Sequence, residues 1–381
     1  MIAVRNPEEL LCELIAVPSV NPQFLPPGSE YAGEAAAGKW LADRAAKAGL
    51  DIEWQEVQPN RANLLVRLAP SGRAKQRVFL APHLDTVGGD ELPGNLFTPQ
   101  RKGGRIHGRG ACDTKGTVAV MFAALCELSS SSNRPKETEI TFVGLVDEEY
   151  GQLGSRALVK SGVKADLAIV GEPTRLKVVT THKGALWLRL ITHGKAAHGA
   201  RPELGRNAVH EMARVVDALE TDYAKQLNRR RHSLLGRATI NVGAIQGGRQ
   251  PNIVPDRCSI MIDRRTLPGE TDANVLREIR TLLRKRRLRV GFEPLHSGSC
   301  FPMETDSNLP LVRDFMKVAR QKTPAGVNFF SDAGVLAAGG IPAVLFGPGD
   351  IAQAHKLDEW IEQDQLEKAK SLLLRFLQSL P

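Results

Sequence analysis

The chain has 381 residues, which is long for one hydrophobic core, so we expect two domains. Charged residues make up 24% and hydrophobic residues 42%, as in ordinary globular proteins, and no apolar run is long enough to span a bilayer, so we expect no membrane association. The five cysteines are dispersed and form no CxxC pair, which indicates reduced thiols rather than a disulfide scaffold.

The first predicted element is a helix that begins after Asn6. Asn6 is a suitable N-cap, Pro7 stands at the first helical position, and Glu9 is where the acid of a capping box belongs. The apolar face of this helix ends by Pro18. The first residues hold neither a long apolar core nor a cleavage-site pattern, so we expect no signal peptide and a cytoplasmic protein.

Four short apolar runs predict buried strands, and polar side chains follow each of them. The runs are VFLAPHLD, ITFVGLVDEE, LAIVGEP and AVLFGPGD. Helical patterns such as residues 115–128 lie between them, and strands that alternate with helices predict an α/β fold with a mostly parallel sheet. Such sheets bind ligands outside the carboxyl ends of their strands, so one crevice could collect all the polar residues.

The pattern changes between about residues 180 and 294. Partly alternating strands are predicted at 184–194, 238–248 and 257–267, and helices at 205–220 and 271–287. The order strand–helix–strand–strand–helix suggests a small α+β insertion with an antiparallel sheet that has one wet face.

Two basic runs contribute to the net charge of +9, at residues 228–232 and 284–289. They suggest either a nucleic-acid patch or a solvated helix face. Ile279, Leu282 and Leu283 share one side of the second predicted helix, and few aromatic residues lie nearby to stack on bases. We therefore favour the solvated face and expect no nucleic-acid partner.

The polar residues at the strand ends have the composition of a metal site. They are His83, Asp85, Glu148, Glu149, Glu172 and His355, joined by Asp113 in GRGACDTKG. Two imidazoles and several carboxylates suit Zn²⁺, Co²⁺ or Mn²⁺, and one bridging carboxylate would hold two ions roughly 3.5–4 Å apart. Of the adjacent pair Glu148 and Glu149, one can bind metal while the other accepts a proton. The plainer alternative for His83 alone is a hydrogen-bonded histidine at a strand end.

Five motifs in this order carry a resemblance that covers nearly the whole chain: PHLDTV, GRGACDTKG, DEEYGQLGS, GEPT and GPGDIAQAH. They resemble the M20 family of metal-dependent amidohydrolases and peptidases. The insertion resembles that family's lid or dimerisation domain. The resemblance implies a discontinuous zinc-hydrolase catalytic domain at residues 1–179 and 295–381, with an inserted ferredoxin-like lid at residues 180–294.

The resemblance also implies a role for each matched residue. Asp113 would bridge the two ions, His83 and Glu172 would complete one site, and Glu149 and His355 the other. Asp85 would orient His83, and Glu148 would be the general base. The family has a cis peptide at the position of Asp113–Thr114. The expected cofactor is a pair of divalent cations, with Zn²⁺ as the first choice and Co²⁺ or Mn²⁺ as alternatives.

For substrate recognition, the resemblance implies a homodimer in which His198 reaches the partner's active site and helps to hold the oxyanion. Asn252 and Arg265 match lid positions that bind the substrate's polar groups and carboxylate, since Arg forms bidentate carboxylate pairs. Asp332 lies where the family has a substrate-facing loop, and an acid there would suit a cationic substrate.

The sequence is most similar to the acetylornithine deacetylase and succinyl-diaminopimelate desuccinylase branches. We therefore expect a cytoplasmic hydrolase of N-acylated amino acids, of the acetylornithine deacetylase kind used in arginine biosynthesis. A desuccinylase and a dipeptidase or carboxypeptidase are alternatives within the same chemistry. A non-catalytic binding protein on a degenerate hydrolase scaffold is the alternative from another class, but the complete ligand set and Glu148 argue against it.

Overall fold

The computed structural model describes residues 6–88, 94–295 and 298–381, and it divides the chain into two units. The first unit comprises Met1–Thr180, Glu304–Gly326 and Ser331–Pro381, and the second comprises Thr181–Met303 and Val327–Phe330. The predicted insertion ends at residue 294, whereas the second unit continues to Met303 and also includes Val327–Phe330. The roles of catalytic domain and lid stay predictions, and the expectation of no signal peptide rests partly on residues 1–5, outside the described part.

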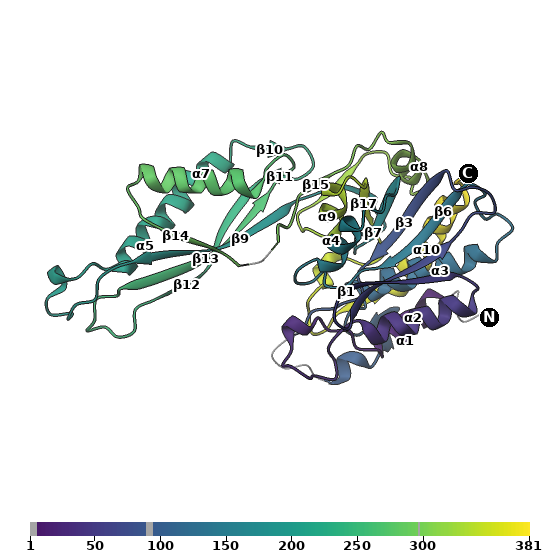
Figure 1. The fold of residues 1–381 in the computed structure, drawn as a ribbon, viewed down its shortest axis with the longest axis horizontal. Helices are drawn as coiled ribbons and strands as arrows, with labels where there is room; N and C mark the ends of the chain where they lie inside the picture. The colour runs from purple at the N-terminus through teal and green to yellow at the C-terminus, as the bar shows by residue number, and fades with distance from the viewer. Residues whose placement is uncertain (1–5, 89–93, 296–297) are drawn as a thin grey trace. The chain divides into compact units, whose positions relative to one another are not determined.

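The first unit is built on a nine-stranded sheet with the order β1-β2-β6-β3-β7-β17-β8-β15, and β16 pairs with β8 (Figure 1). These strands are β1 (Asp51–Gln58), β2 (Arg61–Leu68), β3 (Gln76–Pro82), β6 (Thr138–Gly144), β7 (Leu167–Gly171), β8 (Val179–His182), β15 (Met303–Glu304), β16 (Ala325–Val327) and β17 (Ala343–Phe346). A smaller sheet has the order β18-β5-β4, formed by β4 (Gln100–Lys102), β5 (Arg105–His107) and β18 (Trp360–Glu362).

The central strands β6, β3, β7 and β17 are parallel to one another, whereas β1, β2 and β8 join antiparallel. The central strands are buried along almost their whole length. Helices cover both faces of the sheet, which is why these segments read as continuous Val, Ile, Leu and Phe runs rather than as alternating ones. The expected α/β class is confirmed, with a parallel centre and antiparallel margins.

One helical layer packs on one face of this sheet and buries most of the first unit's core. Its helices are α1 (Pro7–Ile15), α2 (Ala35–Lys47), α3 (Lys115–Ser129), α8 (Pro310–Val318) and α10 (Gln363–Gln378). Helix α3 is buried nearly all round because α1 and α10 cover the side that faces away from the sheet. The two remaining helices, α4 (Leu153–Lys160) and α9 (Asp332–Ala338), contact each other, and α9 also packs on β7 and β17.

The second unit is a four-stranded antiparallel sheet with the order β12-β13-β9-β14. Its elements follow the chain order of a ferredoxin-like fold: β9 (Gly184–His193), α5 (Ala208–Asp217), β12 (Thr239–Gly247), β13 (Arg257–Thr266), α7 (Asp272–Lys285) and β14 (Gly291–Pro294). A π-helical turn (Ala218–Tyr223) and the short helix α6 (Ala224–Leu227) continue α5, and a small hairpin joins β10 (Arg231–His232) to β11 (Gly236–Arg237).

Helices α5 and α7 lie on the same face of this sheet (Figure 1) and bury its second hydrophobic cluster. Val275, Ile279, Leu282 and Leu283 of α7 are buried there, as the periodicity predicts. The opposite face is open, with Met261 of β13 40% exposed. Strand β12 lies at one edge of the sheet, so its outer backbone groups have no neighbouring strand in the described residues.

One arginine of each basic run forms ion pairs within the second unit. Arg230 forms ion pairs with Glu270 and Glu278 at 2.9 and 2.8 Å, and Arg286 pairs with Asp222 at 2.6 Å. Within the described parts of the chain, no helix is both long and apolar enough to cross a membrane.

Candidate metal centre

The predicted metal ligands of the first unit follow the carboxyl ends of its central strands. His83 comes directly after β3, Glu172 directly after β7, and Glu148 and Glu149 shortly after β6. Because these strands are parallel neighbours, their ends meet at one edge of the sheet. His355 arrives at the same edge through a 3₁₀ turn (Ile351–Gln353) beyond β17.

One cluster of potential ligand atoms consists of His83, Asp113 and Glu172. All three residues are buried, and the ligand atoms lie within 4.8 Å of one another. His83 Nε2 lies 3.2 Å from Asp113 Oδ1. One imidazole nitrogen and two carboxylate oxygens therefore lie close enough together to bind the same cation.

A second cluster consists of Asp113, Glu149 and His355. His355 Nε2 lies 3.4 Å from Asp113 Oδ2 and 3.2 Å from Glu149 Oε2. Asp113 therefore presents one oxygen to each cluster, which is the arrangement of a carboxylate that bridges two cations. The peptide bond Asp113–Thr114 is cis, as the resemblance implies.

Asp85 holds several of these residues in place. The Nδ1 of His83 donates to the carbonyl oxygen of Asp85 at 2.9 Å, with Asp85 Oδ1 at 3.4 Å, which leaves Nε2 free for a ligand role. The Asp85 carboxylate also accepts the backbone N–H groups of Glu148 and Glu149, both at 3.1 Å. Asp85 therefore holds the imidazole of His83 and the backbone of the tandem glutamates, while its role in orienting a metal ligand stays a prediction.

Glu148 is buried beside the ligand clusters. Burial raises its pKa well above the usual value, and the negative charges of Glu172 and Asp332 act in the same direction, while His83 opposes them. Burial, followed by the charge of Asp113, likewise raises the pKa of Glu149 to about 7. This edge of the sheet thus concentrates more negative charge than its two imidazoles balance.

The donor set fits divalent cations on its own chemistry. Oε1 of Glu149 is buried and has no hydrogen-bond partner among the described residues. A buried carboxylate oxygen without a partner costs free energy unless a cation or water meets it. Imidazole nitrogen and carboxylate oxygen are the ligands that Zn²⁺ and related dications take in proteins.

Asp332 is the first residue of α9 and is only 1% exposed. Ser155 Oγ donates to its Oδ1 at 2.5 Å, and its Oδ2 has no partner among the described residues. Burial, opposed in part by the Ser155 hydrogen bond, raises the pKa of Asp332 to about 7. Asp332 therefore lies deep in the first unit, where its charge acts on Glu148 and Glu172.

A buried polar network behind Asp85 was not predicted from the sequence. Arg61 pairs with Glu34 and, at 2.9 Å, with Asp147, and Asn21 donates to both Asp147 and Asp85 at 3.0 and 2.8 Å. Asp147 has a φ of 70°, a left-handed conformation that turns the chain just before the tandem glutamates. No local motif marks Asn21, Glu34 or Arg61, because their partners are brought together only by the fold.

Cys112, next to the shared Asp113, donates its thiol to the carbonyl oxygen of Asp350 at 3.2 Å. Burial and the charge of Asp113 raise the pKa of this thiol. Cys112 is therefore a neutral, hydrogen-bonded residue behind the site. Glu359, also missed by the sequence analysis, accepts a hydrogen bond from the backbone N–H of Asp113 at 2.9 Å.

A cavity of about 730 Å³ opens beside the second cluster, with Glu149 and His355 in its wall. The rest of its lining consists of Gln23, Phe24, Leu25, Pro26, Val87 and Gly88. As far as the described residues go, this part of the wall is mainly apolar and offers no basic side chain, so it suits an uncharged substituent next to the ligand clusters.

His198, predicted to be catalytic, and the predicted substrate-binding residues Asn252 and Arg265 belong to the second unit. His198 is exposed, and its Nδ1 accepts the backbone N–H of Ala200 at 3.1 Å. Asn252 lies beside it, since its carbonyl oxygen accepts the N–H of Gly199 at 2.7 Å. The Arg265 guanidinium pairs with Asp263 at 3.0 Å and lies 6.0 Å from the ring centroid of Trp187.

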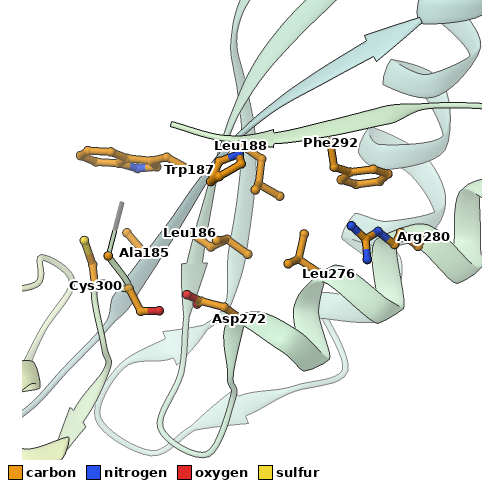
Figure 2. Close-up of a pocket in the computed structure, with 12 residues that line it drawn as sticks. Ala185, Leu186, Trp187, Leu188, Asp272, Leu276, Arg280, Phe292 and Cys300 are labelled. Atoms are coloured by element: carbon orange, nitrogen blue, oxygen red, sulfur yellow. The ribbon is translucent and has the colours of Figure 1, made fainter. Parts of the chain in front are cut away.

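A further pocket of about 310 Å³ lies between β9, β14 and α7 (Figure 2). Leu186, Leu188 and Leu276 form its apolar wall, while Asp272 and Arg280 supply its charged groups. Among the described residues that line it, Asp272 is accompanied by no imidazole and no second acid, so this described lining makes no ligand set like those of the first unit.

Comparisons with known proteins agree with the geometry of the first unit. The profile of the peptidase family M20/M25/M40 matches residues 79–379. The acetylornithine deacetylase of Myxococcus xanthus is 31% identical over 347 residues, which cover 87% of this chain and 88% of that protein.

Solved structures share the fold over almost the entire chain. An M20 family metallo-carboxypeptidase from Sulfolobus solfataricus has a TM-score of 0.79 at 20% identity and covers 98% of both chains. YXEP from Bacillus subtilis, a dinuclear metal-binding peptidase of the M20 family, has a TM-score of 0.72 at 13% identity and covers 99% of this chain and 98% of its own. This chain belongs to the peptidase family M20/M25/M40 and is a metal-dependent hydrolase of amide bonds.

Proposed function

We propose that the chain removes an acyl group from an N-acylated amino acid with the help of two divalent cations, as an acetylornithine deacetylase does. The observation that carries this proposal is Asp113, whose two carboxylate oxygens each approach a different imidazole. A carboxylate shared in this way, beside a buried glutamate that binds neither imidazole, supports hydrolysis rather than simple metal storage.

In this proposal, His83, Asp113 and Glu172 hold one ion, and Asp113, Glu149 and His355 hold the other. Zn²⁺ is the first choice, and Co²⁺ or Mn²⁺ can occupy the same ligand types. When bound, such ions polarise a carbonyl group and lower the pKa of water.

Glu148 takes the proton from the attacking water and delivers it to the leaving nitrogen. Its backbone N–H is fixed by Asp85, so its side chain is held at the edge of the two clusters. A carboxylate with a raised pKa is suited to proton transfer near neutral pH. Asp85 assists indirectly, because it fixes the tautomer and the orientation of His83.

For the substrate's other groups, we assign Asn252 and Arg265 to polar and carboxylate recognition and Asp332 to selection for a cationic side chain. His198 acts on the oxyanion from a second subunit. A homodimer is therefore part of the proposal, and the unpaired edge of β12 supports it, because a second copy can satisfy those backbone groups.

The substrate class follows from the relatives and from the cavity beside Glu149. Its apolar lining accepts an acetyl group, whereas the described lining residues outside the ligand clusters offer no basic side chain to a succinyl carboxylate. We place the enzyme in amino-acid biosynthesis, on the route to arginine, and in the cytoplasm. A desuccinylase and a dipeptidase remain the alternatives to be tested.

The test is a substrate panel with metal-loaded protein. Acetate release from N-acetylornithine, succinate release from N-succinyl-diaminopimelate and amino-acid release from dipeptides are compared with Zn²⁺, Co²⁺ and Mn²⁺. We expect the highest kcat/KM for N-acetylornithine. A protein that binds two ions yet prefers a succinylated or peptide substrate would move the proposal to that branch, and no hydrolysis of any substrate would contradict it.

A further inference from the structure

Glu359 lies behind the ligand clusters, is 2% exposed, and uses both oxygens of its carboxylate. Oε1 accepts the backbone N–H groups of Cys112 and Asp113, both at 2.9 Å. Oε2 accepts the N–H of Gly110 at 2.9 Å and the Arg109 guanidinium at 3.0 Å. Four donors therefore converge on one side chain that comes from 246 residues further along the chain.

The same two chain segments make further contacts. The backbone N–H of Gly108 donates to the carbonyl oxygen of Glu359 at 3.1 Å, and Arg109 Nη1 donates to the carbonyl oxygen of Lys356 at 3.0 Å. One segment ends at Asp113 and the other begins at His355. Glu359 thus clamps together the two segments that supply two of the three residues in the second cluster.

The second cluster depends on this clamp more than the first does. His83 and Glu172 follow directly from buried sheet strands, which fix their backbones. His355, in contrast, lies after a 3₁₀ turn, and its side chain is 56% exposed. The residues that follow His355 directly in the chain, 356–359, are hydrogen-bonded to the loop that contains Asp113. These hydrogen bonds hold His355 next to that loop.

A carboxylate is required for this clamp. Glutamate has two oxygens that accept only, so it can satisfy four donors. Glutamine would present an NH₂ group to either the Asp113 side or the Arg109 side, and it would leave the buried guanidinium without its ion-pair partner.

We propose that Glu359 is a positioning residue that sets the distance between Asp113 and His355 and thereby determines the affinity of the second ion. This inference rests on the proposed function, since it assumes that two ions bind. Residues that orient metal ligands change metal affinity by about 10- to 100-fold when they are replaced. Here the loss falls on the ion held by Asp113, Glu149 and His355.

The experiment compares Glu359→Gln with Asp358→Asn, a matched control that removes a neighbouring exposed carboxylate. Metal-free full-length protein is titrated with Zn²⁺ against a competing chelator, and bound zinc is counted by mass spectrometry. Circular dichroism verifies the fold of each variant. The wild type and Asp358→Asn should bind two ions, while Glu359→Gln should bind the first ion within about threefold of wild type and the second about 10- to 100-fold more weakly.

Two results would overturn the assignment of Glu359. One is a variant that keeps both zinc affinities, and the other is a variant that loses both equally, which would indicate general destabilisation. If Glu359→Gln does not fold, Glu359→Asp is tested in its place, because it keeps the negative charge but is too short to reach both the Asp113 side and the Arg109 side. The second zinc ion should again be weakened more than the first. If the wild type binds fewer than two zinc ions, the proposed function and this inference are both overturned. If the wild type binds two ions and Glu359→Gln binds both with the same affinities, only the role of Glu359 is overturned.

Discussion

Each unit contains a network of charged side chains, and the two networks differ in whether their positive and negative charges balance. In the second unit, Arg264 is completely buried and pairs with Glu270 at 2.6 Å, while Arg230 pairs with Glu270 and Glu278. Tyr223 completes the network, since Arg264 Nε donates to its hydroxyl at 3.2 Å. Two guanidinium groups meet two carboxylates, so the charges of this network balance.

The cluster at the sheet edge of the first unit does not balance. Carboxylates outnumber imidazoles, and one buried oxygen, Glu149 Oε1, has no partner among the described residues. The pKa values show the same contrast. Burial acts to raise the pKa of Glu270, but Arg264 and the other hydrogen-bond donors have a larger opposite effect, so this pKa lies below the usual value. Burial raises the pKa values of Glu148 and Glu172 well above the usual value.

The comparison separates a structural charge network from a functional one. A structural network supplies its own counter-charges and loses stability when one member is removed. The sheet-edge cluster leaves its excess charge for a ligand, so its members can be replaced with a larger effect on activity than on folding. The following predictions test that distinction in order of expected effect.

Metal removal should have the largest effect. Dialysis against a chelator should abolish amide hydrolysis completely, because the two imidazoles of the site balance only part of its carboxylate charge and cannot replace the bound ions. Activity should return on addition of Zn²⁺, Co²⁺ or Mn²⁺, and circular dichroism should detect little change in the second unit's secondary structure. Full activity after verified metal removal would contradict the account.

Replacing the general base should have the next largest effect. Glu148→Gln should lower kcat by about a thousandfold, since general-base catalysis contributes on this scale. The variant should still bind two ions, because Glu148 belongs to neither ligand cluster. Loss of metal together with activity would instead make Glu148 a ligand, and unchanged kcat would remove it from the mechanism.

The balanced network should respond in the opposite way. Glu270→Ala should lower the free energy of unfolding of the second unit by about 3 kcal/mol, because Arg264 stays buried without its ion-pair partner. Metal content should not change. Glu293→Ala is the control, since its exposed pair with Arg189 at 4.0 Å should contribute less than about 0.5 kcal/mol. Denaturant midpoints measure both effects, and equal midpoints for the two variants would contradict the contrast.

Two buried histidines refine the comparison with the smallest expected effect. Burial acts to lower the pKa of His83, but hydrogen bonds to the carboxylates of Asp113 and Asp85 outweigh it and raise this pKa, whereas burial lowers the pKa of His182 from 6.5 to about 4. The unfolded chain therefore binds the proton of His182 more tightly, and stability from this group is lost as the pH falls below 6.5. Between pH 7 and pH 5, the wild type should lose about 2 kcal/mol that His182→Gln does not lose. Parallel stability curves would contradict this assignment.

Much of the fold could be predicted because its signals are local. Asn6 caps α1 as expected and accepts the N–H groups of Glu8 and Glu9, although the helix ends at Ile15, before its predicted limit at Pro18. The predicted helix at 115–128 corresponds to α3 at Lys115–Ser129. Strand β14 was missed, because four residues that end in a proline carry no alternation.

The sequence predicts those site residues that belong to a motif. It does not predict residues whose role depends on contacts with distant parts of the chain. The structure brings His83, Asp113, Glu149, Glu172 and His355 into two adjoining clusters, but their function as ligands stays a proposal. Glu34, Arg61 and Glu359 carry no motif, since each is defined by partners far away in sequence. Arg264 is likewise defined by tertiary contacts, since its side chain is fully buried and pairs with Glu270.

The most direct test of the central claim is anomalous diffraction at the zinc edge from crystals of the wild-type protein grown with Zn²⁺. The account predicts two peaks on either side of Asp113, with one bonded to His83 and Glu172 and the other to Glu149 and His355, at about 2.0–2.2 Å from each ligand atom. A folded, zinc-saturated protein with no peak within bonding distance of Asp113 would contradict it.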